Sequence, residues 1–166
     1  MLLLTQAAAS EEIDRAIKYG GLLTKAVQGK DRVKLKKLTE YKQIKTFLSQ
    51  HKCSGMKYKG YIVGDNQDKY LYLVASKSKN IIIGRHFKAP IKGTDIIYNE
   101  FESSTNSCLN LGTPPKDTQA VYATHLKPYP NEFHILQSNL SGVALYVGTP
   151  SENYAIENGE VRVLEQ

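Results

Sequence analysis

The sequence predicts an α+β fold in which N-terminal helices pack on one face of a mostly antiparallel β-sheet. Apolar residues recur with a helical period before residue 52 and with a period of two after residue 56. The helical segments come first and the strand-like segments follow, without the strand–helix alternation that is typical of parallel sheets. A length of 166 residues fits one domain. We therefore expect a single domain over residues 1–166, with a helical part at 10–52, an antiparallel sheet at 56–148 and a C-terminal segment at 149–166.

Two helices are predicted in the N-terminal part. Ser10 is a favourable N-cap residue, and the two glutamates that follow it suit the positive end of a helix dipole. Gly20-Gly21 are expected to end or kink this helix. Over Val33–Gln50 apolar side chains recur every three or four residues. This spacing predicts an amphipathic helix with lysines on its outer face.

The sheet is predicted from runs rich in Ile, Val and Tyr that are separated by turn-forming residues. The polar, proline-containing segment 102–117 is expected to be a long loop. The expected strands are Met56–Val63, Tyr70–Ala75, Asn80–Phe87, Asp95–Phe101, Ala120–Leu126, Glu132–Gln137 and Val143–Val147.

The net charge of +6 is unevenly distributed along the chain. Residues 30–59 hold ten basic and two acidic side chains, whereas residues 94–166 hold three basic and nine acidic ones. A basic block with interleaved tyrosines favours an anionic partner, RNA above all, although a lysine-rich helix is also often only a solvated surface. The acidic C-terminal half could neutralise the basic half or contact a basic protein. The candidate nucleic-acid-binding residues are Lys34, Lys36, Lys37, Lys42, Lys45, Lys52, Lys57, Lys59 and Arg85.

Two short segments, His86-Phe87-Lys88 and His125-Leu126-Lys127, repeat the same pattern of histidine and lysine. Residues two apart in a strand share a face, so each segment would place an imidazole beside an ammonium group. An imidazole can transfer a proton near neutral pH and an ammonium group can neutralise a phosphate, which together suit metal-independent RNA cleavage. The candidate catalytic residues are His86, His125, Lys88, Lys127 and Thr124, with Arg85, Ser104, Thr105 and Tyr122 as further donors.

Other interpretations of the histidines stay open. Each could be a surface residue or a hydrogen-bonded, half-buried one. His134 could be the partner of His125 across a hairpin with its turn at Pro128–Asn131, whereas His51 lies at a helix end, where a cation is favourable in any case.

Several classes of protein and site are disfavoured by what the sequence lacks. No Walker A, GxGxxG, HExxH or CxxC motif occurs, so neither a metal nor a cofactor is expected. Cys53 and Cys108 permit at most one intramolecular disulfide, and a reducing compartment fits at least as well as an oxidising one. No apolar run approaches ~18 residues, and no classical signal peptide is evident. We expect no membrane segment and a cytoplasmic site of action.

Over residues 10–147 the order of elements, the basic charge and the supply of His, Lys and Ser/Thr side chains resemble the bacterial toxin ribonucleases of the barnase, EndoU and colicin-type group. The resemblance implies an endoribonuclease that works without metal. His86 and His125 would then be the general acid and base, and Lys88, Lys127 and Thr124 would stabilise the phosphate. Two alternatives remain: a non-catalytic module that binds nucleic acid or another anionic surface through residues 30–59, and a virus- or phage-type factor that contacts a basic protein.

Overall fold

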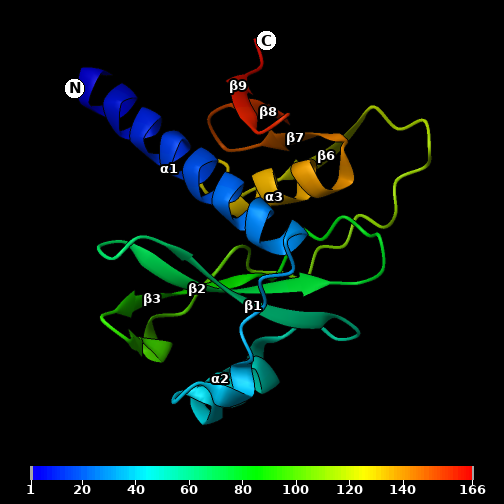
Figure 1. Cartoon of the computed structure of the whole chain (residues 1–166). Coiled ribbons are helices and arrows are strands. Elements are labelled where there is room, and N and C mark those ends of the chain that lie inside the picture. Colours follow the sequence, from blue (N-terminus) through cyan, green and yellow to red (C-terminus); the bar gives the residue numbers. More distant parts are fainter. Residues whose placement is uncertain (1, 166) are drawn as a thin grey trace. The chain divides into compact units, whose positions relative to one another are not determined.

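The computed structural model of the chain describes residues 2–165, so Met1 and Gln166 lie outside the described residues. The chain divides into two compact units (Figure 1). The central unit comprises Ala26–Gly112, and the terminal unit combines Met1–Lys25 with Thr113–Gln166. Since a compact unit need not fold on its own, the single domain over residues 1–166 stays a prediction.

The central unit contains an antiparallel sheet of five strands. Strand β1 (Lys57–Gly64) pairs with β2 (Lys69–Ser76), β2 pairs with β3 (Phe87–Lys92), and β3 pairs with both β4 (Asp95–Ile96) and β5 (Glu102–Ser103). The first two strands confirm the runs expected at 56–63 and 70–75.

Helix α2 (Tyr41–His51) packs on one face of this sheet. Ile44 is fully buried, and the Phe47 ring lies edge-on to Phe87, with 4.9 Å between ring centroids. The amphipathic spacing places the apolar side chains of α2 against β2 and β3 while Lys42 and Lys45 remain exposed. This packing confirms the predicted α+β class. The buried cluster between helix and sheet consists of Ile44, Leu71, Leu73, Phe87, Ala89 and Ile96.

The terminal unit contains a second, four-stranded sheet. Its strands run in the order β6 (Ala120–Thr124), β7 (Ala144–Gly148), β8 (Asn153–Glu157) and β9 (Glu160–Val163). Strands β6 and β7 are parallel and are connected through helix α3 (Glu132–Ser141), whereas the other pairs are antiparallel. The expectation that the fold contains no strand–helix–strand unit was therefore wrong.

Helix α1 (Leu2–Gln28) is longer than predicted. Ser10 lies in its interior and is not an N-cap, and Gly20-Gly21 do not end the helix. A Cβ added at Gly20 would lie 2.7 Å from the Cβ of Ile135 in α3. The close approach of α1 to α3 therefore explains why residue 20 is a glycine. The helix does not break there.

The segment expected as a strand at Glu132–Gln137 is the first part of α3. Asn131 is the N-cap, since its side chain accepts hydrogen bonds from the N–H groups of Phe133 and His134, and the His134 ring accepts from the N–H of Asn131. All residues of 132–138 are buried. A helix that is buried all round shows no apolar stripe, so its period was not visible in the sequence.

Two other expected strands are largely absent from the described chain. The segment 80–87 is irregular, because the N–H groups of Ile81 and Ile83 donate to the carbonyls of Gly112 and Leu109 in the loop instead of to a strand. Of the run expected at 95–101, two residues form β4, and the short 3-10 helix η2 (Tyr98–Glu100) follows.

Candidate nucleic-acid interface

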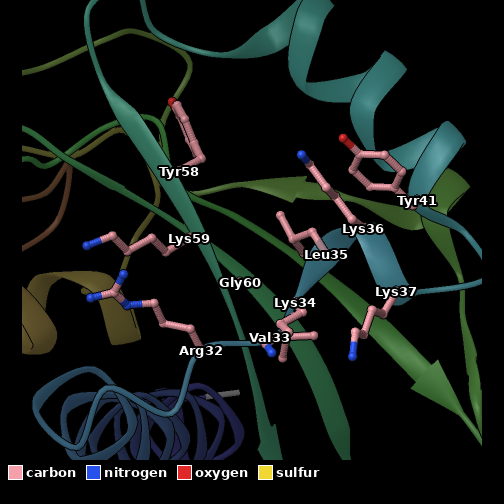
Figure 2. Close-up of a pocket in the computed structure, with 10 residues that line it drawn as sticks. All are labelled: Arg32, Val33, Lys34, Leu35, Lys36, Lys37, Tyr41, Tyr58, Lys59 and Gly60. Carbon is pink, nitrogen blue, oxygen red and sulfur yellow. The ribbon is translucent and has the colours of Figure 1, made fainter.

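The central unit carries a groove of about 520 Å³ whose charged lining residues are all basic. Five positively charged side chains surround an apolar centre, and no acidic side chain lines it (Figure 2). The lining residues are Arg32, Val33, Lys34, Leu35, Lys36, Lys37, Tyr41, Tyr58, Lys59 and Gly60.

The groove lies where the segment before α2 crosses strand β1. The predicted helix over Val33–Gln50 is broken here: Val33 forms an isolated bridge to Gly60, its N–H donating to the Gly60 carbonyl at 2.8 Å. The 3-10 helix η1 (Leu35–Lys37) follows, and α2 begins only at Tyr41. A Cβ on Gly60 would lie 2.7 Å from Leu35 Cδ2, so the missing side chain lets Leu35 pack directly on the strand backbone.

Tyr58 lines the groove, and its hydroxyl group is engaged in hydrogen bonds with the backbone. The hydroxyl accepts a hydrogen bond from the N–H of Cys53 at 3.0 Å and donates one to the carbonyl of Arg85 at 2.9 Å. The ring also stacks with Phe87, at 5.9 Å between centroids. Burial raises the pKa of Tyr58 above its ordinary value, so this hydroxyl stays protonated at neutral pH.

The structure brings together four of the nine predicted nucleic-acid-binding residues, namely Lys34, Lys36, Lys37 and Lys59. Four others, Lys42, Lys45, Lys52 and Lys57, are exposed and do not line the groove. Sequence reasoning missed Arg32 and Tyr41 as groove residues, although both lie inside or beside the basic block and could have been found there.

Arg85, the ninth, holds two parts of the central unit together. Its guanidinium group donates to the carbonyl of His51 at 3.3 Å and to that of Asn106 at 2.7 Å. It thus connects the end of α2 to the loop after β5. Its predicted role in nucleic-acid binding stays a prediction.

A disulfide lies beside Arg85. Cys53 and Cys108 are bonded, with their Cα atoms 5.7 Å apart, and the N–H of Arg85 donates to the Cys53 sulfur at 3.2 Å. The one disulfide that the sequence permitted is thus formed, and it joins the same two segments that Arg85 bridges. Disulfides persist in oxidising environments, so this bond favours an oxidising compartment, whereas the two cysteines alone fitted a reducing compartment at least as well.

His86 is fully buried in the central unit, and its ring binds the backbone on both sides. Nδ1 accepts a hydrogen bond from the N–H of Ala75 at 3.0 Å, so Nε2 carries the proton and donates to the carbonyl of Ile82 at 2.7 Å. Burial lowers the pKa of His86 to about 4. Both ring nitrogens are engaged and the ring is inaccessible, which disfavours the predicted role of His86 as general acid or base; that role stays a prediction.

Two groups near His86 also have structural contacts. The Ser104 hydroxyl accepts from the N–H of His86 and donates to the carbonyl of Ile83, and Thr105 donates to the carbonyl of Ser107. Lys88 lies over the ring of Tyr70, with 5.3 Å from Nζ to the ring centroid. The predicted pairing of Lys88 with the His86 imidazole stays a prediction.

His125 belongs to the terminal unit, and its neighbour there is His134. The two ring centroids lie 4.7 Å apart in an edge-to-face arrangement. The rings are therefore neighbours, but the hairpin that was expected to pair them is not formed, because His134 lies in α3. Both residues are buried, with 6% and 1% of their surface exposed. Burial, and then the charge of Lys127, lowers the pKa of His125. This is the geometry of a packed pair, and not of an open catalytic centre.

The remaining predicted catalytic residues, Thr124 and Lys127, are exposed in the terminal unit, as is Tyr122. His51 is exposed at the end of α2, where its ring lies 4.5 Å from that of Phe47. Within residues 2–165, no three His, Cys, Asp or Glu side chains are grouped so that they could hold a metal ion. The helices of this described range include none with the length and apolar character needed to cross a membrane.

Comparisons of this chain with protein-family models, with curated proteins and with solved structures found no significant match.

Proposed function

We propose that the protein binds nucleic acid, without cleaving it, through the basic groove of the central unit. The observation that carries this proposal is the lining of the groove: five cationic side chains and no acidic one around a hollow of about 520 Å³. Phosphates bound by lysine and arginine release counterions, which is the main source of affinity for nucleic acids.

The charge of the whole central unit supports the proposal. Residues 26–112 contain 16 basic and seven acidic side chains, a net charge of +9. A polyanion approaching this unit therefore meets a positive field well before it reaches the groove.

Binding is favoured over the predicted ribonuclease activity because the histidines are buried. His86 has both ring nitrogens on backbone groups, and His125 packs against His134. Cleavage of RNA in the presence of EDTA stays a prediction. So does the binding of a basic protein by the acidic C-terminal half.

The test is a binding titration with a short fluorescent single-stranded oligonucleotide, followed by anisotropy between about 50 and 200 mM salt. One variant carries Lys34→Gln, Lys36→Gln, Lys37→Gln and Lys59→Gln. The matched control carries Lys42→Gln, Lys45→Gln, Lys52→Gln and Lys57→Gln, which removes the same charge from the same unit but outside the groove.

We expect the groove variant to lose at least about tenfold in affinity and about three units of the slope of log K against log salt, because four phosphate contacts disappear. The control should lose much less. Equal losses in the two variants, or binding that does not respond to salt, would contradict the proposal. Tighter binding to anionic phospholipid vesicles than to the oligonucleotide would also contradict it.

A further inference from the structure

We infer that the groove receives a single nucleic-acid strand and that an unpaired base lies in its apolar centre. This inference rests on the proposed function and names the form of nucleic acid that the same site would take.

The groove is divided into an apolar middle and a charged rim. Leu35 and Gly60 lie in the middle, with Arg32 and Lys59 on one side and Lys36 and Tyr41 on the other (Figure 2). The basic side chains of the rim can neutralise phosphates, whereas the apolar middle has no charged group that could bind a phosphate. The flat face of a base, in contrast, gains by leaving water for such a surface.

The shape of the groove also suits a single strand better than a duplex. A hollow of about 520 Å³ falls within the range of roughly 300–1,000 Å³ that is typical of small-ligand sites, so it can admit a nucleotide-sized group. A duplex keeps its bases stacked inside and presents a convex row of phosphates. Such a surface would touch the rim and leave the hollow empty. A single strand can turn a base outward and fill it.

One aromatic residue of the groove, Tyr58, is held in place before a ligand arrives. Tyr58 is fixed by its hydrogen bonds to Cys53 and Arg85, and Tyr41 is half-buried as the first residue of α2. Little side-chain freedom is then lost when a base packs against the Tyr58 ring. Stacking of a base on an aromatic ring is worth ~1–3 kcal/mol, or about 5- to 150-fold in affinity.

The test compares three ligands of equal length at one salt concentration: a single strand, its duplex and an abasic single strand that keeps the phosphates but has no bases. RNA and DNA versions of the single strand are both used, since the inferred contacts involve base and phosphate only. We expect the single strands to bind at least about fivefold more tightly than the duplex and the abasic strand. Duplex or abasic ligand binding as tightly as the single strand would overturn the inference.

Variants of Tyr41 test whether the base packs against the ring of this residue. Tyr41→Leu should lose at least about fivefold in affinity for the single strand while the salt slope is unchanged, because the phosphate contacts remain. Tyr41→Phe, which keeps the ring, should recover the affinity that Tyr41→Leu loses. Tyr98→Leu, which alters an exposed tyrosine of the same unit outside the groove, is the matched control. Normal binding by Tyr41→Leu would overturn the role of Tyr41.

The abasic ligand tests the inference without any variant, so a misfolded Tyr41→Leu protein does not leave it undecided. The outcomes also separate the two proposals. If the lysine variant loses binding but duplex and single strand bind equally, the proposed function stands and the inferred base site fails. If no oligonucleotide binds, the proposed function itself fails.

Discussion

The central and terminal units differ in charge and in what holds them together. The central unit carries 16 basic and seven acidic side chains, whereas the terminal unit carries six basic and nine acidic ones, a net charge of −3. The +6 of the whole chain therefore understates the charge of the unit that contains the groove. An anionic partner should be sought for residues 26–112 and not for the chain as a whole.

The two units also use different means to fix their irregular segments. In the central unit the long loop after β5 has little regular structure and is tied down by a disulfide and by the guanidinium group of Arg85. In the terminal unit α1 and α3 pack so closely that only glycine fits at position 20. A covalent bond stabilises the first arrangement and shape complementarity stabilises the second, so different changes should weaken each.

Removal of the disulfide should have the largest effect on stability. The bond joins residues 55 positions apart, and closing a loop of this length is worth about 4 kcal/mol in the chain-entropy account. We expect the double variant Cys53→Ala/Cys108→Ala to lower the free energy of unfolding of the central unit by up to this amount. Hydrogen exchange followed by mass spectrometry measures the loss of protection unit by unit.

Exchange in the terminal unit is the internal control for that experiment. If its amides keep their protection, the two units open separately. If both units lose protection equally, they unfold together as the predicted single domain, and the proposed difference in stability between the units does not hold.

The second-largest effect is a loss of stability on acidification, which depends on His86. The folded-state pKa is about 4 and the ordinary value is 6.5, so between these values the unfolded chain binds a proton that the folded chain does not. The lowered pKa of His86 therefore stabilises the folded state fully above pH 6.5. This contribution of ~3 kcal/mol to the free energy of unfolding is lost as the pH falls towards 4. Urea unfolding at pH 7 and pH 4 measures this loss.

A variant separates His86 from the carboxylates that titrate in the same range. His86→Gln should be less stable at pH 7, because the hydrogen bonds to Ala75 and Ile82 are disturbed, yet it should lose less stability on acidification than the unaltered protein. His51→Gln, at an exposed position, is the control and should behave like the unaltered protein. Identical pH dependence in His86→Gln would show that another group is responsible.

The smallest expected changes in stability come from substitutions at two adjacent glycines of the terminal unit. Gly20→Ala places a methyl group 2.7 Å from Ile135 and should destabilise by ~1–3 kcal/mol. Nothing lies within 4 Å of a Cβ at Gly21, so Gly21→Ala should stabilise α1 by up to ~1 kcal/mol. Thermal unfolding distinguishes the two signs. Destabilisation by both alanines would mean that α1 is less regular than described.

The parts of the fold that were predicted correctly are those whose local pattern reflects their surroundings. The apolar stripe of α2 faces the sheet, and the runs at β1 and β2 pair as expected. Helix α3 was missed because its first seven residues are all buried. The hairpin of β8 and β9 did have a signal: Asn158-Gly159, both with positive φ, form the two-residue turn that such hairpins favour.

The candidate site was predictable in its charge but not in its geometry. The basic block indicated the right part of the chain, because lysine clusters are visible in any sequence. That η1 and β1 form a groove depends on Gly60 and its bridge to Val33, a long-range pairing that no local pattern reveals. For the same reason the sequence could not distinguish a buried, hydrogen-bonded His86 from a catalytic one.

The disulfide also determines what a single proteolytic cut would do. The exposed turn between β1 and β2 lies between Cys53 and Cys108, so cleavage there leaves two fragments joined by the sulfur bridge. All ten groove-lining residues precede this turn and stay on one fragment, while β2 to β5 remain tethered to it. A nicked chain would therefore migrate as one species until a reductant is added, and its groove would keep every lining residue.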